Sequence, residues 1–339
     1  MKVAVLRAVG EPLAIEETPA PRPGPGEALL RVRACGIDGT DLKLLDGFGY
    51  VPDLPFVMGH EVAGEVVECG ADVTSFAAGD RVVVYNFVTC GSCVYCRRSR
   101  DQLCLDMRGI VGILDVPGGY ADYVCLPEQQ LIRLPDGVRF EDGATCCDAG
   151  MTALHAVDRA DVSIGDRVLV IGLGGVGSVV TQILAASGVE VIAVDTDAAK
   201  ESWARAHGAA AFLSLEADAL VAEALRRSAG LGVDRVIDVV GLEDTMRAGF
   251  AALRRGGRMV IVGYTPEAFP LPGKELAQNE KEVLGTRAGR RDDLRTCLGL
   301  FGAGKLRSIV RATYPLQSVN EALDALRGGV IGRIVLTFD

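Results

Sequence analysis

The stretch Val168–Asp197, "VLVIGLGGVGSVVTQILAASGVEVIAVDTD", carries the strongest indication of fold class in this chain. An apolar run reaches glycines at Gly172, Gly174 and Gly177, where a helical pattern opens, and a second apolar run ends at Asp195. Glycines at this spacing let the backbone approach a pyrophosphate at the positive N-terminus of a helix. A carboxylate after the second strand can accept hydrogen bonds from an adenosine ribose. The stretch predicts a strand, helix and strand that bind a dinucleotide.

The residues around Asp195 favour NAD over NADP. The Asp195 carboxylate would repel a 2′-phosphate, and Asp197 follows it rather than an arginine, with Lys200 only later. The residues predicted to bind this cofactor are Gly172, Gly174, Gly175, Val176, Gly177, Asp195 and Lys200.

The rest of the chain predicts an α/β protein of two domains. From about Asp166, apolar runs alternate with helical stretches, as in a doubly wound parallel sheet with helices on both faces. The first 150 residues instead show short alternating runs between turn signals, which indicates a compact, mostly β domain. The closing stretch from Ser308 shows a further strand, helix and strand.

Composition excludes several classes of partner. The 339 residues carry a formal net charge of -10, which leaves no basic field for nucleic acid or an anionic membrane. Residues 168–189 are free of charge, but their glycines and the pair Thr181–Gln182 favour a buried strand and helix over a membrane span. No export signal is visible, so we expect a cytoplasmic protein whose ten cysteines are reduced or bind metal.

Four of those cysteines form one array. Cys90, Cys93, Cys96 and Cys104 lie within the segment 90–104 in a C-x2-C-x2-C-x7-C spacing. Four thiolates in one loop are typical of a closed tetrahedral zinc site, which stabilises the loop and takes no part in chemistry.

With these motifs the chain resembles the zinc-containing alcohol dehydrogenases of the medium-chain dehydrogenase/reductase superfamily. The resemblance also covers "MGHEVAGEVVECGADVTSFAAGDRV", "GGYADYVCLP" and the closing "GRIVLTF". It implies a chaperonin-10-like catalytic domain (residues 1–150 and 291–339) with the zinc lobe, and a Rossmann NAD-binding domain (residues 151–290). The active site would lie in the cleft between them.

The resemblance also implies a catalytic zinc, but two of the usual thiolates are aspartates here. Asp38 falls at the first ligand position, His60 at the second and Asp148 at the third, while Glu61 matches a carboxylate behind the metal. Two carboxylates carry the same charge as two thiolates, and zinc accepts both. The set is harder and less selective among divalent ions, so EDTA should remove this metal faster than the lobe zinc.

Two alternatives remain open for this position. In the first, the metal is absent and both aspartates are polar loop residues lining a cleft. In the second, a small shift of register brings Cys35 or Cys147 into the coordination shell. Gly36 and Gly150 argue against the shift, because these motif glycines keep the alignment fixed.

Several further residues match family positions. Thr40 corresponds to the hydroxyl that relays the substrate proton, unless it only caps a turn; Asp41 corresponds to a supporting acid or a helix N-cap. Lys43 stands where many relatives end the relay in histidine; it could bind cofactor phosphate, titrate or be solvated. Arg333 matches an arginine near the cofactor pyrophosphate.

The sequence thus predicts an NAD- and zinc-dependent dehydrogenase that interconverts a secondary or cyclic alcohol, polyol-like alcohols included, and its ketone or aldehyde. Its only partners would be a small alcohol or carbonyl substrate and copies of itself in a homodimer or homotetramer. One competing hypothesis is a reductase of an activated C=C or C=N bond that uses NAD(P)H and lacks the catalytic metal. Another is a protein that senses or holds the dinucleotide without turnover.

Overall fold

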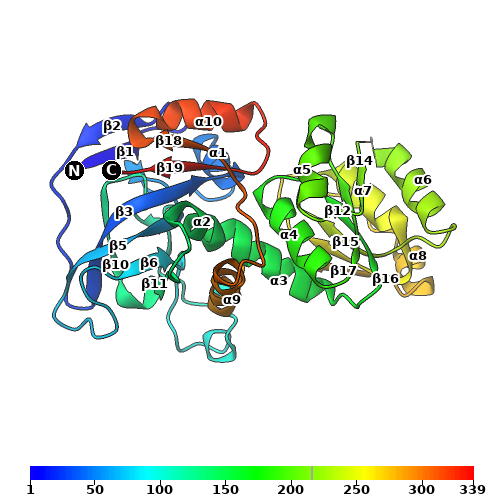
Figure 1. The fold of residues 1–339 in the computed structure, drawn as a ribbon, viewed down its shortest axis with the longest axis horizontal. Coiled ribbons are helices and arrows are strands. Elements are labelled where there is room, and N and C mark those ends of the chain that lie inside the picture. Colours follow the sequence, from blue (N-terminus) through cyan, green and yellow to red (C-terminus); the bar gives the residue numbers. More distant parts are fainter. Residues whose placement is uncertain (215–216) are drawn as a thin grey trace. The chain divides into compact units, whose positions relative to one another are not determined.

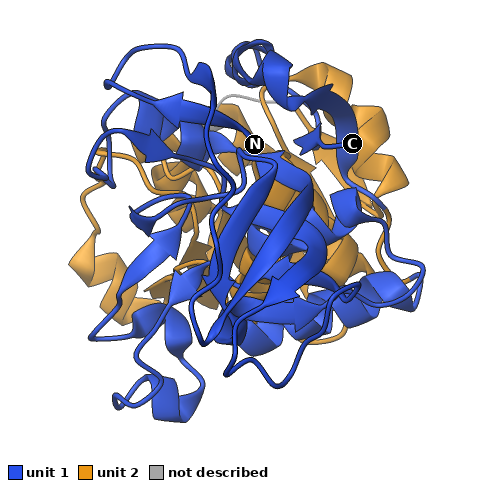
Figure 2. Cartoon of the chain, turned by 90° about the vertical axis from the view of Figure 1, so that its left-hand side faces the viewer, with its two compact units in different colours: residues 1–150, 290–304, 308–339 blue, residues 151–289, 305–307 orange. Residues whose placement is uncertain are grey.

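The computed structural model describes residues 1–214 and 217–339, which form two compact units. Unit 1 comprises residues 1–150, 290–304 and 308–339, and unit 2 comprises residues 151–289 and 305–307 (Figure 2). Each unit has its own sheet and its own candidate binding residues, so each is described by itself.

Unit 2 is built on a six-stranded sheet in which all pairs are parallel (Figure 1). The strand order is β14-β13-β12-β15-β16-β17. The first of these strands along the chain, β12, is therefore central, and the order reverses beside it, which is the arrangement of a Rossmann domain. The strands are β12 (Arg167–Ile171), β13 (Glu190–Val194), β14 (Ala211–Leu213), β15 (Val233–Asp238), β16 (Leu253–Ile261) and β17 (Glu282–Gly285).

Helices connect these strands and cover the sheet. Buried apolar residues of β12, β13 and β16, with the described apolar side chains of the helices, form the core of the unit. The helices are α3 (Met151–Ala160), α4 (Gly175–Ala186), α5 (Glu201–Ala206), α6 (Ala217–Arg227), α7 (Glu243–Ala252) and α8 (Gly273–Gln278).

The uncharged stretch 168–189 is a strand and a helix, as its glycines indicate. It comprises most of β12 and all of α4, and the helix is only 12 residues long. Among the described residues, no helix combines the length and the apolar character needed to cross a membrane.

Unit 1 is mostly β structure with a seven-stranded sheet as its centre. The order β11-β6-β5-β3-β19-β18, with β10 also paired to β3, places the closing strands of the chain beside its long early strand. These strands are β3 (Glu27–Ile37), β5 (Glu61–Cys69), β6 (Arg81–Val84), β10 (Tyr123–Pro127), β11 (Leu131–Arg133), β18 (Val310–Pro315) and β19 (Arg333–Thr337).

Smaller elements complete unit 1. Two three-stranded sheets have the orders β2-β1-β4 and β7-β8-β9. Their strands are β1 (Lys2–Leu6), β2 (Ala14–Glu17), β4 (Phe56–Val57), β7 (Phe87–Val88), β8 (Gly109–Val111) and β9 (Asp115–Val116). The helices are α1 (Gly39–Leu45), α2 (Phe140–Thr145), α9 (Arg291–Gly302) and α10 (Val319–Arg327).

The register of β3 brings distant segments to one place. Gly36 of β3 is paired with Glu61 of β5 on one side and with Val335 of β19 on the other. The end of β3, the start of β5 and the start of β19 therefore meet at the same end of the sheet, where polar side chains can converge.

Candidate metal centres

Asp38, His60 and Asp148 lie together in unit 1. Asp38 follows the last residue of β3, His60 precedes the first residue of β5, and Asp148 lies in a single π-helical turn, Cys146–Gly150, after α2. One ligand atom of each residue lies within 4.8 Å of the others. Single π-helical turns often occur at functional sites because they redirect side chains within a helix.

Asp38 has a structural role in addition. It is the N-cap of α1, where its Oδ1 accepts a hydrogen bond from the backbone N of Thr40 at 2.7 Å. Asp41 completes this capping box, because its Oδ2 accepts from the backbone N of Asp38 at 2.9 Å. The cap fixes the carboxylate of Asp38 at the start of the helix. The sequence suggested Asp41 as a possible N-cap, but the N-cap is Asp38 and Asp41 lies three residues further on.

The imidazole of His60 faces two carboxylates. Its Nε2 lies 3.6 Å from Oδ1 of Asp38, and its Nδ1 lies 3.7 Å from Oδ1 of Asp41. His60 has no exposed surface, and neither ring nitrogen has a hydrogen-bond partner among the described residues. A buried imidazole nitrogen without a partner beside two carboxylates is suited to bind a metal ion.

Arg333 lies among the carboxylates of this group. Its Nη2 donates to Oε1 of Glu61 at 2.9 Å and lies 3.7 Å from Oδ2 of Asp148, while its Nη1 lies 3.7 Å from Oδ2 of Asp38. Oε1 of Glu61 also accepts from the backbone N of Ala149 at 3.1 Å. Arg333 is thus a counter-ion of the acidic group, and its contact with a cofactor pyrophosphate stays a prediction.

The pKa values of the group reflect burial and mutual charge. Burial raises the pKa of Glu61 to about 8 although Arg333 opposes the shift, and burial together with Asp38 raises the pKa of Asp148 to about 6. Burial disfavours the charged forms of Asp38 and His60, but their mutual attraction outweighs it. The pKa of Asp38 is therefore lowered and that of His60 is raised.

The donor set fits a divalent cation. Two carboxylate oxygens and one imidazole nitrogen are accepted zinc ligands, and three protein ligands leave a position for substrate or water. A bound cation would stabilise the ionised carboxylates and the neutral imidazole, and would thereby offset the cost of burying them.

Cys35 and Cys147 are near these residues but their sulfurs contact backbone carbonyls. Sγ of Cys147 donates to the carbonyl of Val62 at 3.4 Å, and Sγ of Cys35 donates to that of Gly36 at 3.8 Å. Burial is the main reason that both thiols have a pKa well above the ordinary value. Neither sulfur belongs to the group formed by Asp38, His60 and Asp148.

Thr40 and Lys43 both lie on α1. Both side chains are half-buried. Burial lowers the pKa of Lys43, while the charges of Asp38 and Asp148 oppose the shift. Because Lys43 is half-buried, it does not fit the alternative of a fully solvated side chain. The proton relay through Thr40 stays a prediction.

Gly36 provides a direct test of the buried ion pair between Arg333 and Glu61. A Cβ on Gly36 would lie 1.7 Å from Oε2 and 2.9 Å from Cβ of Glu61. We expect Gly36→Ala to displace the Glu61 carboxylate and to lower the free energy of unfolding by about 3 kcal/mol, because Arg333 loses a buried partner. Urea unfolding measures this change.

Gly39→Ala is the matched control, since a Cβ there meets no atom within 4 Å. The free energy of unfolding of Gly39→Ala should stay near that of the wild type. Equal stability of the Gly36 and Gly39 variants would show that the ion pair does not depend on the space at Gly36.

The second candidate centre is the cysteine lobe. The Sγ atoms of Cys90, Cys93, Cys96 and Cys104 lie within 4.8 Å of one another. Backbone N–H groups point at the sulfurs: the N of Cys93 donates to Sγ of Cys90 at 3.3 Å, and the N of Cys90 donates to Sγ of Cys104 at 3.4 Å. Such bonds, first from Ser92 and then from Cys93, lower the pKa of Cys90 to about 6, and similar bonds, first from Cys96, lower that of Cys93. Burial raises the pKa of Cys96 and of Cys104, so the thiolate forms of these two need the charge of a bound ion.

The glycine turn of unit 2 has the geometry expected of a dinucleotide site. Gly172 has a φ of +94°, α4 begins at Gly175, and a Cβ on Gly174 would meet no atom within 4 Å. Oδ2 of Asp195 accepts from the backbone N of Leu173 at 2.8 Å and from Nζ of Lys200 at 2.8 Å. The carboxylate thus holds the turn and the lysine at the end of β13.

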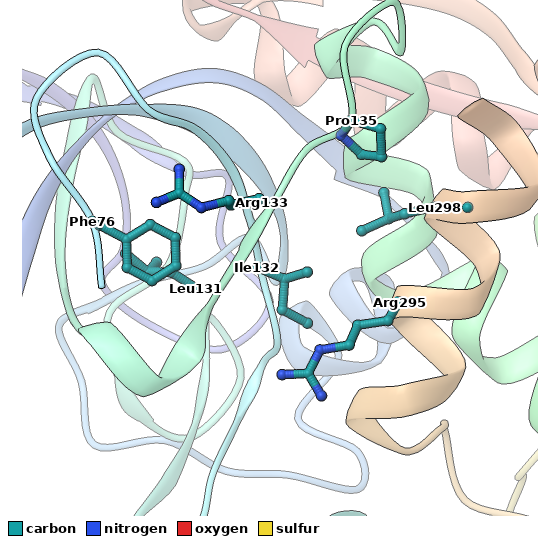
Figure 3. A pocket seen from close by; sticks show the side chains of 8 residues that line it. Phe76, Leu131, Ile132, Arg133, Pro135, Arg295 and Leu298 are labelled. Atoms are coloured by element: carbon teal, nitrogen blue, oxygen red, sulfur yellow. The ribbon is translucent and has the colours of Figure 1, made fainter. Parts of the chain in front are cut away.

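One surface pocket of unit 1 lies apart from both centres. It has a cavity volume of about 400 Å³ and lies between β11 and α9, with its side chains labelled in Figure 3. Its two arginines are paired with carboxylates: Arg133 with Asp80 and Arg295 with Asp292, at 2.7 and 2.8 Å. None of its lining residues is a candidate metal ligand. The residues are Phe76, Leu131, Ile132, Arg133, Pro135, Arg295, Leu298 and Gly299.

Sequence reasoning did not find every residue of the acidic group. It assigned Arg333 to the cofactor and did not consider Tyr120, whose buried ring lies against the loop before His60. The only local signal was an aromatic residue directly after two glycines in "GGYADY".

Comparison with known proteins identifies the family. Residues 24–136 match the family model of the alcohol dehydrogenase GroES-like domain, and residues 175–303 match that of the zinc-binding dehydrogenases. An alcohol dehydrogenase of Geobacillus stearothermophilus is 33% identical over the whole of both chains. An NAD-dependent alcohol dehydrogenase of Sulfolobus acidocaldarius is 34% identical over 99% of each.

A solved structure agrees with this assignment. The cobalt- and zinc-bound thermostable alcohol dehydrogenase from Pyrobaculum aerophilum superposes with a TM-score of 0.91 at 33% identity, covering 100% of this chain and 99% of that one. The chain belongs to the zinc-containing alcohol dehydrogenase family of the medium-chain dehydrogenase/reductase superfamily. It is therefore an oxidoreductase, and NAD and zinc are the cofactors expected of its family.

Proposed function

We propose that the protein is an NAD- and zinc-dependent dehydrogenase that interconverts a secondary or cyclic alcohol, polyol-like substrates included, and its ketone or aldehyde. The observation that carries this proposal is the buried group of Asp38, His60 and Asp148, in which His60 has no hydrogen-bond partner among the described residues. Membership of the family and the glycine turn of unit 2 support it.

The two units would have different roles, one in catalysis and one in binding NAD. Residues 1–150 and 291–339 would form the catalytic domain, with Asp38, His60 and Asp148 as metal ligands and Glu61 behind them. Residues 151–290 would form the NAD-binding domain, with the cofactor pyrophosphate at the N-terminus of α4. Asp195 would accept hydrogen bonds from the adenosine ribose. Lys200, whose Nζ donates to the Asp195 carboxylate, would lie beside the ribose as a further cofactor contact.

The chain's own side chains would position the substrate and move its proton. A zinc ion at Asp38, His60 and Asp148 supplies Lewis-acid polarisation of the substrate oxygen, and NAD supplies the hydride acceptor. Thr40 lies two residues after a ligand, and its hydroxyl can accept the alcohol proton and donate its own onward. Lys43, one turn further along α1, would be the next polar group on that path.

A second candidate function is a reductase of an activated C=C or C=N bond without catalytic metal. The observation that favours it is Arg333, whose guanidinium neutralises part of the charge of Glu61, Asp38 and Asp148. In such an enzyme the acidic group would be structural, and hydride would pass directly from NAD(P)H to carbon.

Metal content separates these two functions. We expect two metal ions per subunit in protein purified without chelator, falling to one after brief EDTA treatment, with loss of alcohol oxidation. The oxygen-rich site releases its ion first, because thiolates hold zinc more tightly than carboxylates. Metal analysis and activity are measured on the same samples.

Zinc added back after EDTA is the control, and it should restore both the second ion and the activity. A constant single ion, with no alcohol oxidation before or after EDTA, would favour the reductase. Two ions that survive prolonged chelation would contradict the weaker binding at the aspartates.

Partners and location follow from the proposed chemistry. The substrate would be a small alcohol or carbonyl compound, and the subunits would associate as a homodimer or homotetramer. All ten cysteines are free of disulfide bonds, which supports a location in the reducing cytoplasm.

A further inference from the structure

Tyr120 is held beside His60 by the backbone. The N of Tyr120 donates to the carbonyl of Met58 at 3.0 Å, and the N of Gly119 donates to that of Gly59 at 2.8 Å. Gly59 has a φ of +98°, and a Cβ there would lie 2.4 Å from Cδ1 of the Tyr120 ring. The absence of a side chain at Gly59 therefore leaves the space that the tyrosine ring fills.

Three buried polar atoms meet at this place. Tyr120, Asp41 and His60 have no exposed surface. The hydroxyl of Tyr120, Oδ1 of Asp41 and Nδ1 of His60 have no hydrogen-bond partner among the described residues. Buried polar atoms are rarely left without partners, so each of these three atoms needs one, and the other two groups are available to supply it.

Asp41 connects the other two groups. Its Oδ2 accepts from the backbone N of Asp38 at 2.9 Å, which fixes one side of the carboxylate. Its Oδ1 lies 3.7 Å from Nδ1 of His60. Burial, and after it the charge and hydrogen bonding of Asp41, raise the pKa of Tyr120 well above the ordinary value. Because a carboxylate has no proton to donate, the hydroxyl beside it can only be the donor.

We propose that Tyr120 is a positioning residue for the metal centre: its hydroxyl donates to Asp41, and Asp41 accepts the Nδ1 proton of His60 so that Nε2 is free to bind the ion. The partner of one ring nitrogen sets which nitrogen a histidine offers to a metal. The part of this inference that concerns metal rests on the proposed function, while the link from Tyr120 to His60 does not.

The test is Tyr120→Phe in the full chain, which removes only the hydroxyl. We expect the affinity for zinc at the oxygen-rich site to fall by about 10- to 100-fold, with the lobe zinc unchanged. A competing chelator measures the affinity with zinc alone as the probe. Tyr85→Phe is the control, because Tyr85 is another fully buried tyrosine of unit 1 whose ring lies under Arg291.

Nitrogen NMR of the imidazoles provides a measurement that does not depend on metal. The chain has only three histidines, so the signals of His60 can be assigned by substitution. We expect the Nδ1 signal of His60 in the metal-free protein to shift in Tyr120→Phe and to stay at its wild-type position in Tyr85→Phe, because only the first change removes the donor to Asp41. Unchanged signals and unchanged zinc affinity in Tyr120→Phe would overturn the proposal.

The route through Asp41 is tested by a double variant. Asp41→Asn should weaken zinc binding by itself, and adding Tyr120→Phe should weaken it no further, because both changes break the same chain of contacts. Losses that simply add would overturn this route. A wild type that binds only the lobe zinc would refute the proposed function, and the NMR comparison would still decide the role of Tyr120.

Discussion

His60→Ala should abolish binding of the second metal ion and lower kcat/KM for alcohol oxidation by about 10³-fold or more, since Lewis-acid polarisation contributes several kcal/mol. His60 supplies the only nitrogen in the group, and its two neighbours, Asp38 and Asp148, both share Arg333. The two remaining oxygens would hold an ion only weakly. Metal analysis and steady-state kinetics measure the two effects.

His207→Ala is the control for this variant, because His207 lies in unit 2 and outside both metal groups. It should keep two metal ions and the wild-type rate. A His60 variant that loses the second ion but keeps its rate of alcohol oxidation would contradict a role of the metal in the reaction.

Gly177→Ala should lower the melting temperature by at least about 5 °C, because an added Cβ overpacks the turn. That Cβ would lie 1.9 Å from the carbonyl oxygen of Gly172, which is backbone and cannot give way as a side chain can. The start of α4 would have to move, and the dinucleotide site would move with it. Thermal unfolding and NADH fluorescence titration measure the two effects.

Gly174→Ala separates packing from cofactor approach. Gly174 has a φ of -82°, which alanine adopts freely, and its Cβ would meet no atom within 4 Å. We expect wild-type stability with NADH affinity reduced by about tenfold or more, because the methyl group stands where the pyrophosphate must approach the backbone. Wild-type affinity in this variant would place the pyrophosphate elsewhere.

Features of this protein that are encoded by residues close together in the chain can be predicted from the sequence, and features that depend on distant residues cannot. The strand, glycine turn and helix at 168–186 are local, so periodicity and glycine spacing predict them, and the structure and the family comparisons confirm the Rossmann fold. The lobe cysteines are also local, because all four lie within one short loop. Short strands such as β14, three residues long, have too little periodicity to be predicted in this way.

For the candidate catalytic site, the sequence predicts which residues belong to it but not how they contact one another. Asp38, His60 and Asp148 could be assigned by resemblance, although no pattern in the sequence states that they are neighbours. The role of Asp38 as the cap of α1 and the contact of Asp41 with His60 depend on the local fold of one turn.

The fold class, the dinucleotide turn and the cysteine lobe can be predicted from the amino-acid sequence, because each is encoded by residues close together in the chain. That Arg333 faces Glu61, 272 residues away, and that Tyr120 lies beside Asp41 and His60, is visible only in the folded chain. These contacts arise from the pairing of β19 with β3 and from the hydrogen bonds between the loop before Tyr120 and the loop before His60. A change of strand register by one residue would place every side chain of the strand on the other face of the sheet, so these contacts depend on the pairing of distant strands and not on a local pattern.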